Sequence, residues 1–297
     1  MRIRSKRVKS GFTLIELSFA IAFISVLLVT ITLITNEIVS IYRKGYSIKT
    51  VNQVGRDLID DFQNSITQSP PASISSFCAR AYPGGNTNCE RDNGFASVYL
   101  QFYSDITIKN ENTSKMLPTG GLFCSGKYTY IWNTGYLFNS EVYDDTPPQI
   151  TLKYTLAGGA SGELRNFHLV KVEDTSRTIC ASYLADATNG GYPVSGTVRS
   201  NPASITIPEP LTEVPEEMLK NSDAALALYD FVLFEPARVS STGRLLFSGS
   251  FILGTITGGV DIMTSSNYCK TPANFSADFN YCAINKFNFT MQASGNK

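Results

Sequence analysis

The chain has 297 residues, of which 43% are hydrophobic and 17% charged, and its 25 basic and 25 acidic residues cancel at pH 7. The charged fraction lies below the roughly 25% of typical soluble domains, and 18 Phe and 15 Tyr residues argue against intrinsic disorder. The single histidine excludes zinc sites that need two histidines, such as the HExxH helix. We therefore expect no metal centre of that type and no bound cofactor.

Basic residues are concentrated at the start of the chain. Residues 1–11 contain no acid and five basic residues, namely Arg2, Arg4, Lys6, Arg7 and Lys9. The remainder has 20 basic against 25 acidic residues, a net charge of −5. This balance gives no electrostatic reason to expect nucleic acid as the main partner, although a local basic patch is compatible with it.

Residues 12–35 form an uninterrupted apolar segment except for one acid. As a helix, about 24 residues rise ~36 Å, which exceeds the ~30 Å hydrocarbon core of a bilayer. The basic residues upstream place the N-terminus in the cytoplasm and the rest of the chain outside. A secretory signal peptide is the competing interpretation, but the segment is too long and no A-x-A-like site closes it. We expect a transmembrane helix that stays on the mature protein.

The exception is Glu16, since an unpaired carboxylate inside a membrane costs on the order of 2.5–3.5 kcal/mol. In one interpretation Glu16 reaches the headgroups and has no role. In the other it pairs with a cation at the same depth. Cleavage between Gly11 and Phe12 would create such a cation, because the new α-amino group of Phe12 would lie near Glu16 of a neighbouring helix.

Residues 9–16 read KSGFTLIE, and with the basic residues before them and the apolar segment after them they resemble the class III leader and N-methylation motif of type IV pilins and type II secretion pseudopilins. The resemblance implies that residues 1–11 are a leader peptide, that prepilin peptidase cleaves after Gly11, and that Phe12 becomes N-methylated. It implies that Glu16 registers each subunit against its neighbour. Other pilin or pseudopilin subunits are then the partners, and the chain is a substrate rather than an enzyme.

The helix is expected to continue beyond the membrane through residues 36–69. Charged residues lie on its other faces, among them Arg56 and Asp61. Spacings of three, four and seven predict an amphipathic stripe, made of Ile38, Val39, Tyr42, Tyr46, Val51, Leu58, Phe62 and Ile66. The two prolines after Ser69 end the helix, and slight bends are expected at Gly45 and Gly55. Such a spine is typical of pilins, although an ordinary signal-anchored domain also explains the stripe.

Residues 70–297 predict an exported, mainly antiparallel β domain, so the expected fold class is α+β. Aromatic or branched runs predict strands at 95–103, 127–132, 149–156, 231–234, 245–256 and 287–291. Glycine pairs, including Gly120-Gly121, predict turns between strands. One short helix is expected within Pro208–Lys220, with Glu216 and Glu217 at its start.

All six cysteines lie beyond the membrane segment, and an even number there predicts disulfides. Proximity in the chain favours Cys78 with Cys89 and Cys269 with Cys282, which leaves Cys124 with Cys180. Free buried thiols and a metal cluster are the alternatives, but no C-x-x-C occurs and the spacings match no zinc pattern.

Other chemistry-bearing residues have ordinary structural interpretations. His168 lies in a strand-like stretch and is expected at a core or an edge. Tyr128, Tyr130 and Trp132 alternate along a predicted strand, which favours a core over an exposed stripe for stacking ligands. Asp144 and Asp145 are adjacent acids that predict a turn, and a calcium site is the alternative.

These expectations combine into one function. The chain is expected to be a minor pilin or pseudopilin at or near the tip of a type IV pilus or secretion pseudopilus. Its β domain is large, and residues 224–230 with 247–249 weakly resemble the J-type minor pseudopilins. It would cross the cytoplasmic membrane once before assembly and lie at the cell surface afterwards. The alternative is a membrane-anchored surface binding module, a tip adhesin or DNA-uptake receptor, and a third class is a surface-anchored hydrolase.

Overall fold

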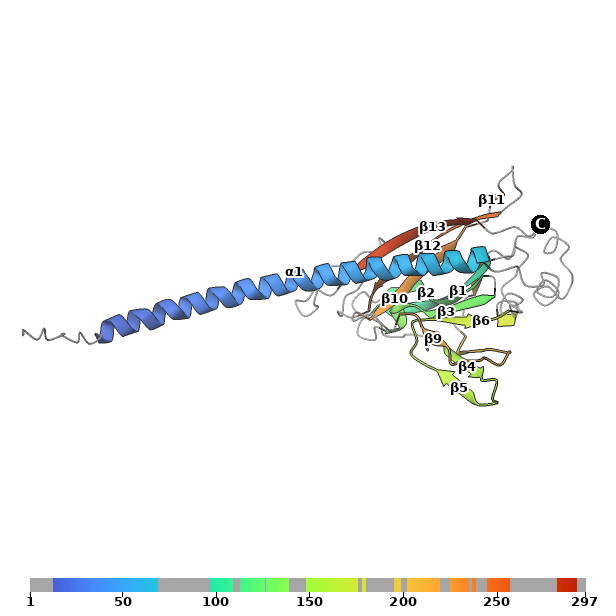
Figure 1. Cartoon of the computed structure of the whole chain (residues 1–297), viewed down its shortest axis with the longest axis horizontal. Helices are drawn as coiled ribbons and strands as arrows, with labels where there is room; N and C mark the ends of the chain where they lie inside the picture. Colours follow the sequence, from blue (N-terminus) through green and yellow to red (C-terminus); the bar gives the residue numbers. More distant parts are fainter. Residues whose placement is uncertain are drawn as a thin grey trace, which may run out of the picture.

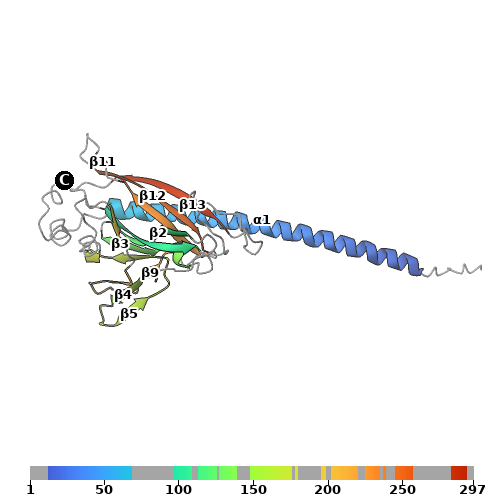
Figure 2. The same cartoon turned by 180° about the vertical axis from the view of Figure 1, so that it is seen from behind.

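The computed structural model describes residues 13–68, 97–108, 113–125, 127–138, 148–175, 178–179, 195–198, 202–219, 225–234, 237–238, 245–256 and 282–292. A single helix, α1 (Leu14–Gln68), leads into a mainly antiparallel β domain, so the predicted α+β class is confirmed. The C-terminal half of α1 runs along the domain, and its N-terminal half projects from it (Figures 1 and 2). The predicted single helix is confirmed, and it ends at Gln68, just before the two prolines.

The central sheet has six strands in the order β7-β1-β2-β3-β6-β9. All neighbours are antiparallel except β7, which is parallel to β1. The strands are β1 (Ser97–Ile108), β2 (Thr113–Ser125), β3 (Tyr128–Asn133), β6 (Leu169–Glu173), β7 (Ser195–Val198) and β9 (Glu216–Glu217). A short 3₁₀ helix, η1 (Gly135–Phe138), follows β3.

Two smaller sheets pack around the central one. In the first, β12 (Leu245–Thr255) pairs antiparallel with three strands. These are β10 (Leu226–Leu233), β11 (Ala237–Arg238) and β13 (Ile284–Gln292). The second, called the outer sheet, has the order β5-β4-β8 and comprises β4 (Thr151–Thr155), β5 (Ser161–Leu164) and β8 (Ser204–Thr206).

The main core lies between α1, the central sheet and the sheet of β10 to β13. The amphipathic stripe of α1 is buried here through Val51, Leu58, Phe62 and Ile66. The ring of Phe62 is 1% exposed and meets five aromatic rings edge-on or tilted, those of Phe123, Tyr130, Phe231, Phe251 and Phe289. The stripe therefore attaches the helix to the domain, because aromatic rings supply large buried areas.

A second core lies between the central sheet and the outer sheet. Ile150 and Leu152 face this core, whereas Lys153 faces solvent, as the alternation along residues 149–156 predicts. Trp132 and Tyr130 are buried in the main core, so the aromatic run of β3 is core rather than an exposed stacking surface.

Two local predictions are wrong. Gly120 and Gly121 do not form a turn but lie inside β2. Gly121 is required there, because a Cβ at this position would overlap the ring of Trp132. Glu216 and Glu217 do not begin a helix but form β9, antiparallel to Val170 and Lys171 of β6. In both places pairing with a neighbouring strand of the sheet overrides the local turn or helix signal.

Gly55 has a role that the expected bend does not describe. A Cβ there would overlap the ring of Phe287 on β13. Gly55 therefore allows this strand to lie directly against the backbone of α1, and a substitution would push the two elements apart. No such contact lies at Gly45, where a Cβ would have open space.

Candidate functional site

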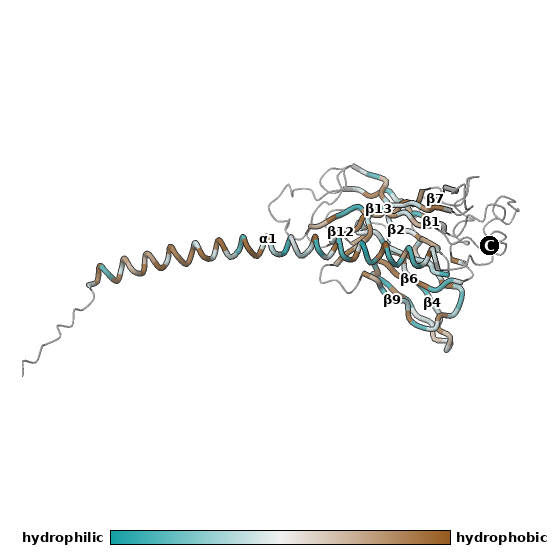
Figure 3. The backbone as a smooth tube through the Cα atoms, turned by 45° about the horizontal axis from the view of Figure 1, so that its top comes forward, coloured by the Kyte–Doolittle hydropathy of each residue, from teal (hydrophilic) through white to brown (hydrophobic). Residues whose placement is uncertain are grey.

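The first candidate site is the projecting half of α1. Its most apolar stretch has no buried residue, and Figure 3 shows the apolar positions recurring on successive turns. The exposed large apolar side chains run from Leu14 through Phe23 and Leu33 to Tyr46 and Ile48. The helix is long and apolar enough to cross a membrane, which is consistent with a single-pass anchor.

At the N-terminal end of this helix, Thr13 and Glu16 bond to one another. Glu16 Oε2 accepts hydrogen bonds from Thr13 N at 2.9 Å and from Thr13 Oγ1 at 3.0 Å. Thr13 Oγ1 in turn accepts one from Glu16 N at 3.4 Å. This reciprocal arrangement is a capping box, and its sequence pattern is T-x-x-E. Sequence reasoning overlooked it, and it gives Glu16 a role within its own chain.

The capping bonds use one oxygen of the Glu16 carboxylate. No bond to Oε1 is recorded among the described residues, and the carboxylate lies exposed at the helix end. One oxygen therefore remains for a donor from another molecule. Gly11 and Phe12, the predicted processing residues, lie outside the described residues.

The other half of α1 is held to the domain by a polar cluster as well as by its stripe. Asp61 accepts from Lys171 Nζ at 2.7 Å and from the Tyr130 hydroxyl at 2.7 Å. The same hydroxyl is hydrogen-bonded to Ser65. Burial and the negative charge of Asp61 both raise the pKa of Tyr130 above its usual value, so the hydroxyl stays protonated. The cluster fixes α1 against β3 and β6, although Asp61 was expected on a face outside the stripe.

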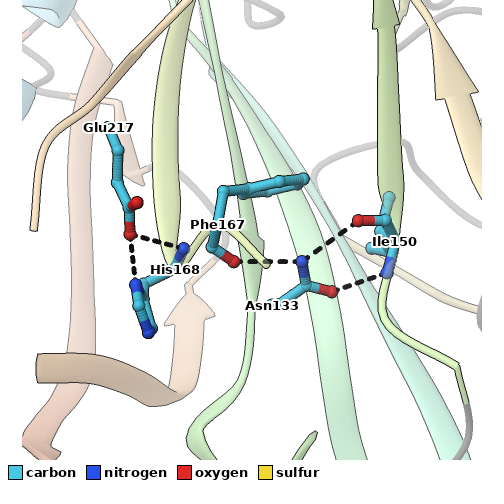
Figure 4. Close-up of polar contacts among 5 residues, drawn as sticks. All are labelled: Asn133, Ile150, Phe167, His168 and Glu217. Atoms are coloured by element: carbon cyan, nitrogen blue, oxygen red, sulfur yellow. Dashed lines mark hydrogen bonds and ion pairs between the residues drawn. The ribbon is translucent and has the colours of Figure 1, made fainter. Parts of the chain in front are cut away.

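His168 joins β6 to β9 (Figure 4). Its Nδ1 pairs with Glu217 Oε1, which also accepts the backbone N–H of His168 at 2.7 Å. The imidazole ring lies against Phe138, with centroids 4.3 Å apart. His168 is thus a partly buried histidine at a sheet edge, as expected, and its pairing fastens the two-residue strand β9.

Asn133, at the end of β3, joins the two sheets that bound the second core. Its Oδ1 accepts from Ile150 N at 2.8 Å, and its Nδ2 donates to the carbonyls of Ile150 at 3.3 Å and Phe167 at 3.1 Å (Figure 4). Asn133, Ile150 and Phe167 are all buried. The amide therefore satisfies three backbone groups that water does not reach. No feature of the sequence marks this asparagine.

The remaining predicted site residues are only partly described. Cys124 and Cys282 are each disulfide-bonded. The proposed pairings stay predictions, because Cys78, Cys89, Cys180 and Cys269 lie outside the described residues, as do Asp144 and Asp145. Within the described ranges, no group of three or more His, Cys, Asp or Glu side chains is placed to hold a metal ion.

No protein-family model, curated protein or solved structure matches this chain.

Proposed function

We propose that this chain is a minor pilin or pseudopilin, a structural subunit that prepilin peptidase processes after Gly11. After processing it is assembled at or near the tip of a type IV pilus or secretion pseudopilus. Before assembly it crosses the cytoplasmic membrane once through residues 12–35, with the β domain outside. Its partners are other pilin or pseudopilin subunits, and it carries out no catalysis of its own.

The observation that carries the proposal is that α1 has two different halves. Its N-terminal half exposes apolar side chains, and its C-terminal half packs against the β domain. Exposed apolar side chains continue beyond residue 35, where the bilayer is expected to end. These are Ile38, Val39, Ile41, Tyr42, Tyr46 and Ile48. A simple anchor does not need them, and apolar side chains that stay exposed to water are unfavourable. Helices of neighbouring subunits, packed side by side, would cover the stripe.

In this proposal Glu16 sets the axial position of each helix relative to its neighbour. Its Oε2 caps its own helix, and Oε1 remains for the α-amino group of Phe12 on a neighbouring subunit. Pairing an ammonium group with the carboxylate removes the penalty of leaving either charge alone in an apolar bundle. An incoming helix at the wrong height would leave both charges unpaired, so the pair selects one stagger.

The Glu16→Gln variant tests this assignment. Glutamine preserves the capping box, since S/T-x-x-Q caps as S/T-x-x-E does, but it carries no charge. We expect the variant to reach the membrane in normal amount and to be lost from the surface fraction sheared off native cells, by about tenfold or more. The measurement is the ratio of sheared to membrane-bound protein by immunoblot.

The matched control is Glu37→Gln, the same chemical change at an exposed position of the same helix. It should be sheared off like the wild type. Normal incorporation of Glu16→Gln would mean that Glu16 acts only as a cap, and the alternative of an anchored surface binding module would then be favoured.

A further inference from the structure

The central sheet ends on an incompletely covered edge. Strand β9 pairs with β6 only at Val170 and Lys171, opposite Glu217 and Glu216. Beyond this pair, β6 continues to Glu173 without a partner strand from the described part of the chain on that side. The short β9 therefore leaves the last part of β6 as an open edge.

The direction of the backbone groups at this edge follows from the neighbouring bonds. Asp174 N donates to Lys127 O on the β3 side, and Met218 N donates to Leu169 O on the β9 side. Because backbone groups alternate along a strand, the N–H and C=O of Glu173 point to the same side as those of Leu169. They point toward the place that a longer β9 would occupy.

A groove lies at this place. It has a volume of about 320 Å³, at the small end of the 300–1,000 Å³ typical of ligand pockets. We call it the β6 groove. Its lining comes from the end of β6, with Lys171, Glu173 and Thr175, and from the segment that leads into β9, residues 209–216.

The β6 groove has an acidic rim and exposed apolar side chains, Val214 among them. Four glutamates line it, namely Glu173, Glu209, Glu213 and Glu216, all of them exposed. Glu173 is paired with Lys127 Nζ at 2.9 Å, so part of the charge of the rim is already balanced. The one lysine in the lining is paired with Asp61, on the face of the sheet that holds α1. Val214 is 54% exposed and offers an apolar contact.

We propose that the β6 groove binds an extended, lysine- or arginine-bearing peptide segment of a partner protein, which adds to the sheet as a strand. Its backbone would bond to the N–H and C=O of Glu173, and its basic side chains would meet the acidic rim. Lys171 contacts Asp61 near the end of α1, so the groove lies at the end of the domain far from the membrane half of the helix. The proposal depends on the β domain alone and does not require the assembly role proposed above.

The test uses the full-length protein in detergent micelles and the peptide acetyl-Lys-Val-Lys-Val-Lys-Val-amide. We expect binding by titration calorimetry at 50 mM salt, weakened at 500 mM because salt screens exposed charges. Amide hydrogen exchange over residues 171–175 should slow on binding. Glu213→Lys should weaken binding by about tenfold, since it turns attraction at the rim into repulsion. Asp105→Lys, the same reversal at an exposed position of β1, should not.

Two further peptides separate strand addition from adsorption by charge. The acidic counterpart, with Glu in place of Lys, should not bind. A version with alternate backbone nitrogens methylated keeps the charges but cannot pair along one edge, and it too should bind at least tenfold more weakly. Equal binding of the methylated peptide, or unchanged exchange over residues 171–175, would overturn the proposal. Neither readout involves filaments, so this result is separate from that of Glu16→Gln.

Discussion

Replacing Phe62 with alanine is expected to lower the free energy of unfolding by about 3–5 kcal/mol. Phe62 is 1% exposed, and its ring touches aromatic residues of both sheets that pack on α1. The substitution removes the transfer free energy of the ring and leaves a cavity that rings on five strands cannot all move to fill. The loss also loosens the apolar packing that attaches α1 to the domain.

The unfolding can be followed in urea by the fluorescence of Trp132, which is the only tryptophan and is 1% exposed. The matched control is Tyr42→Ala on the projecting half of the same helix, where the side chain is 72% exposed. That change should alter stability by less than about 0.5 kcal/mol in detergent. A loss below about 1 kcal/mol for Phe62→Ala would show that the helix is not held by this core.

A second large effect is expected from Asn133→Ala, at about 3–5 kcal/mol, because each buried backbone group left without a partner costs about 1–3 kcal/mol. The variant removes the bonds to Ile150 N, Ile150 O and Phe167 O. These groups cannot reach water where they lie. The outer sheet should therefore detach more readily from the central one.

The comparison uses the same urea titration and Asn288→Ala on β13, an identical change at an exposed strand position. The control should stay within about 0.5 kcal/mol of the wild type. Hydrogen exchange adds a local readout, since the amides of β4 should exchange faster in Asn133→Ala alone. Equal stability of the two variants would contradict the assigned role of Asn133.

The elements with strong periodicity are those that the sequence predicts well. Helix α1 follows from the apolar segment and the stripe that ends at Ile66, and β4 follows from the alternation through Ile150 and Leu152. Both patterns are local, so the residues that define them are close in the chain.

Contacts between distant residues are what the sequence does not reveal. Pro215 followed by two glutamates resembles a helix start, yet Glu216 and Glu217 pair with β6, about 45 residues away. The bonds of Asn133 go to backbone groups, which no residue type marks. The capping box at Thr13 and Glu16 is different, because its T-x-x-E pattern is local and can be read from the sequence.

The intact mass of the protein in filaments sheared from native cells tests whether this chain is processed and built into a filament. We expect a mass that lacks residues 1–11 and carries one additional methyl group, consistent with an N-methylated Phe12. Processed protein confined to the membrane would favour the pseudopilin form of the proposal over the pilus form. Full-length protein found only in the membrane would show that Gly11 is no cleavage site, and the proposed function would then be wrong.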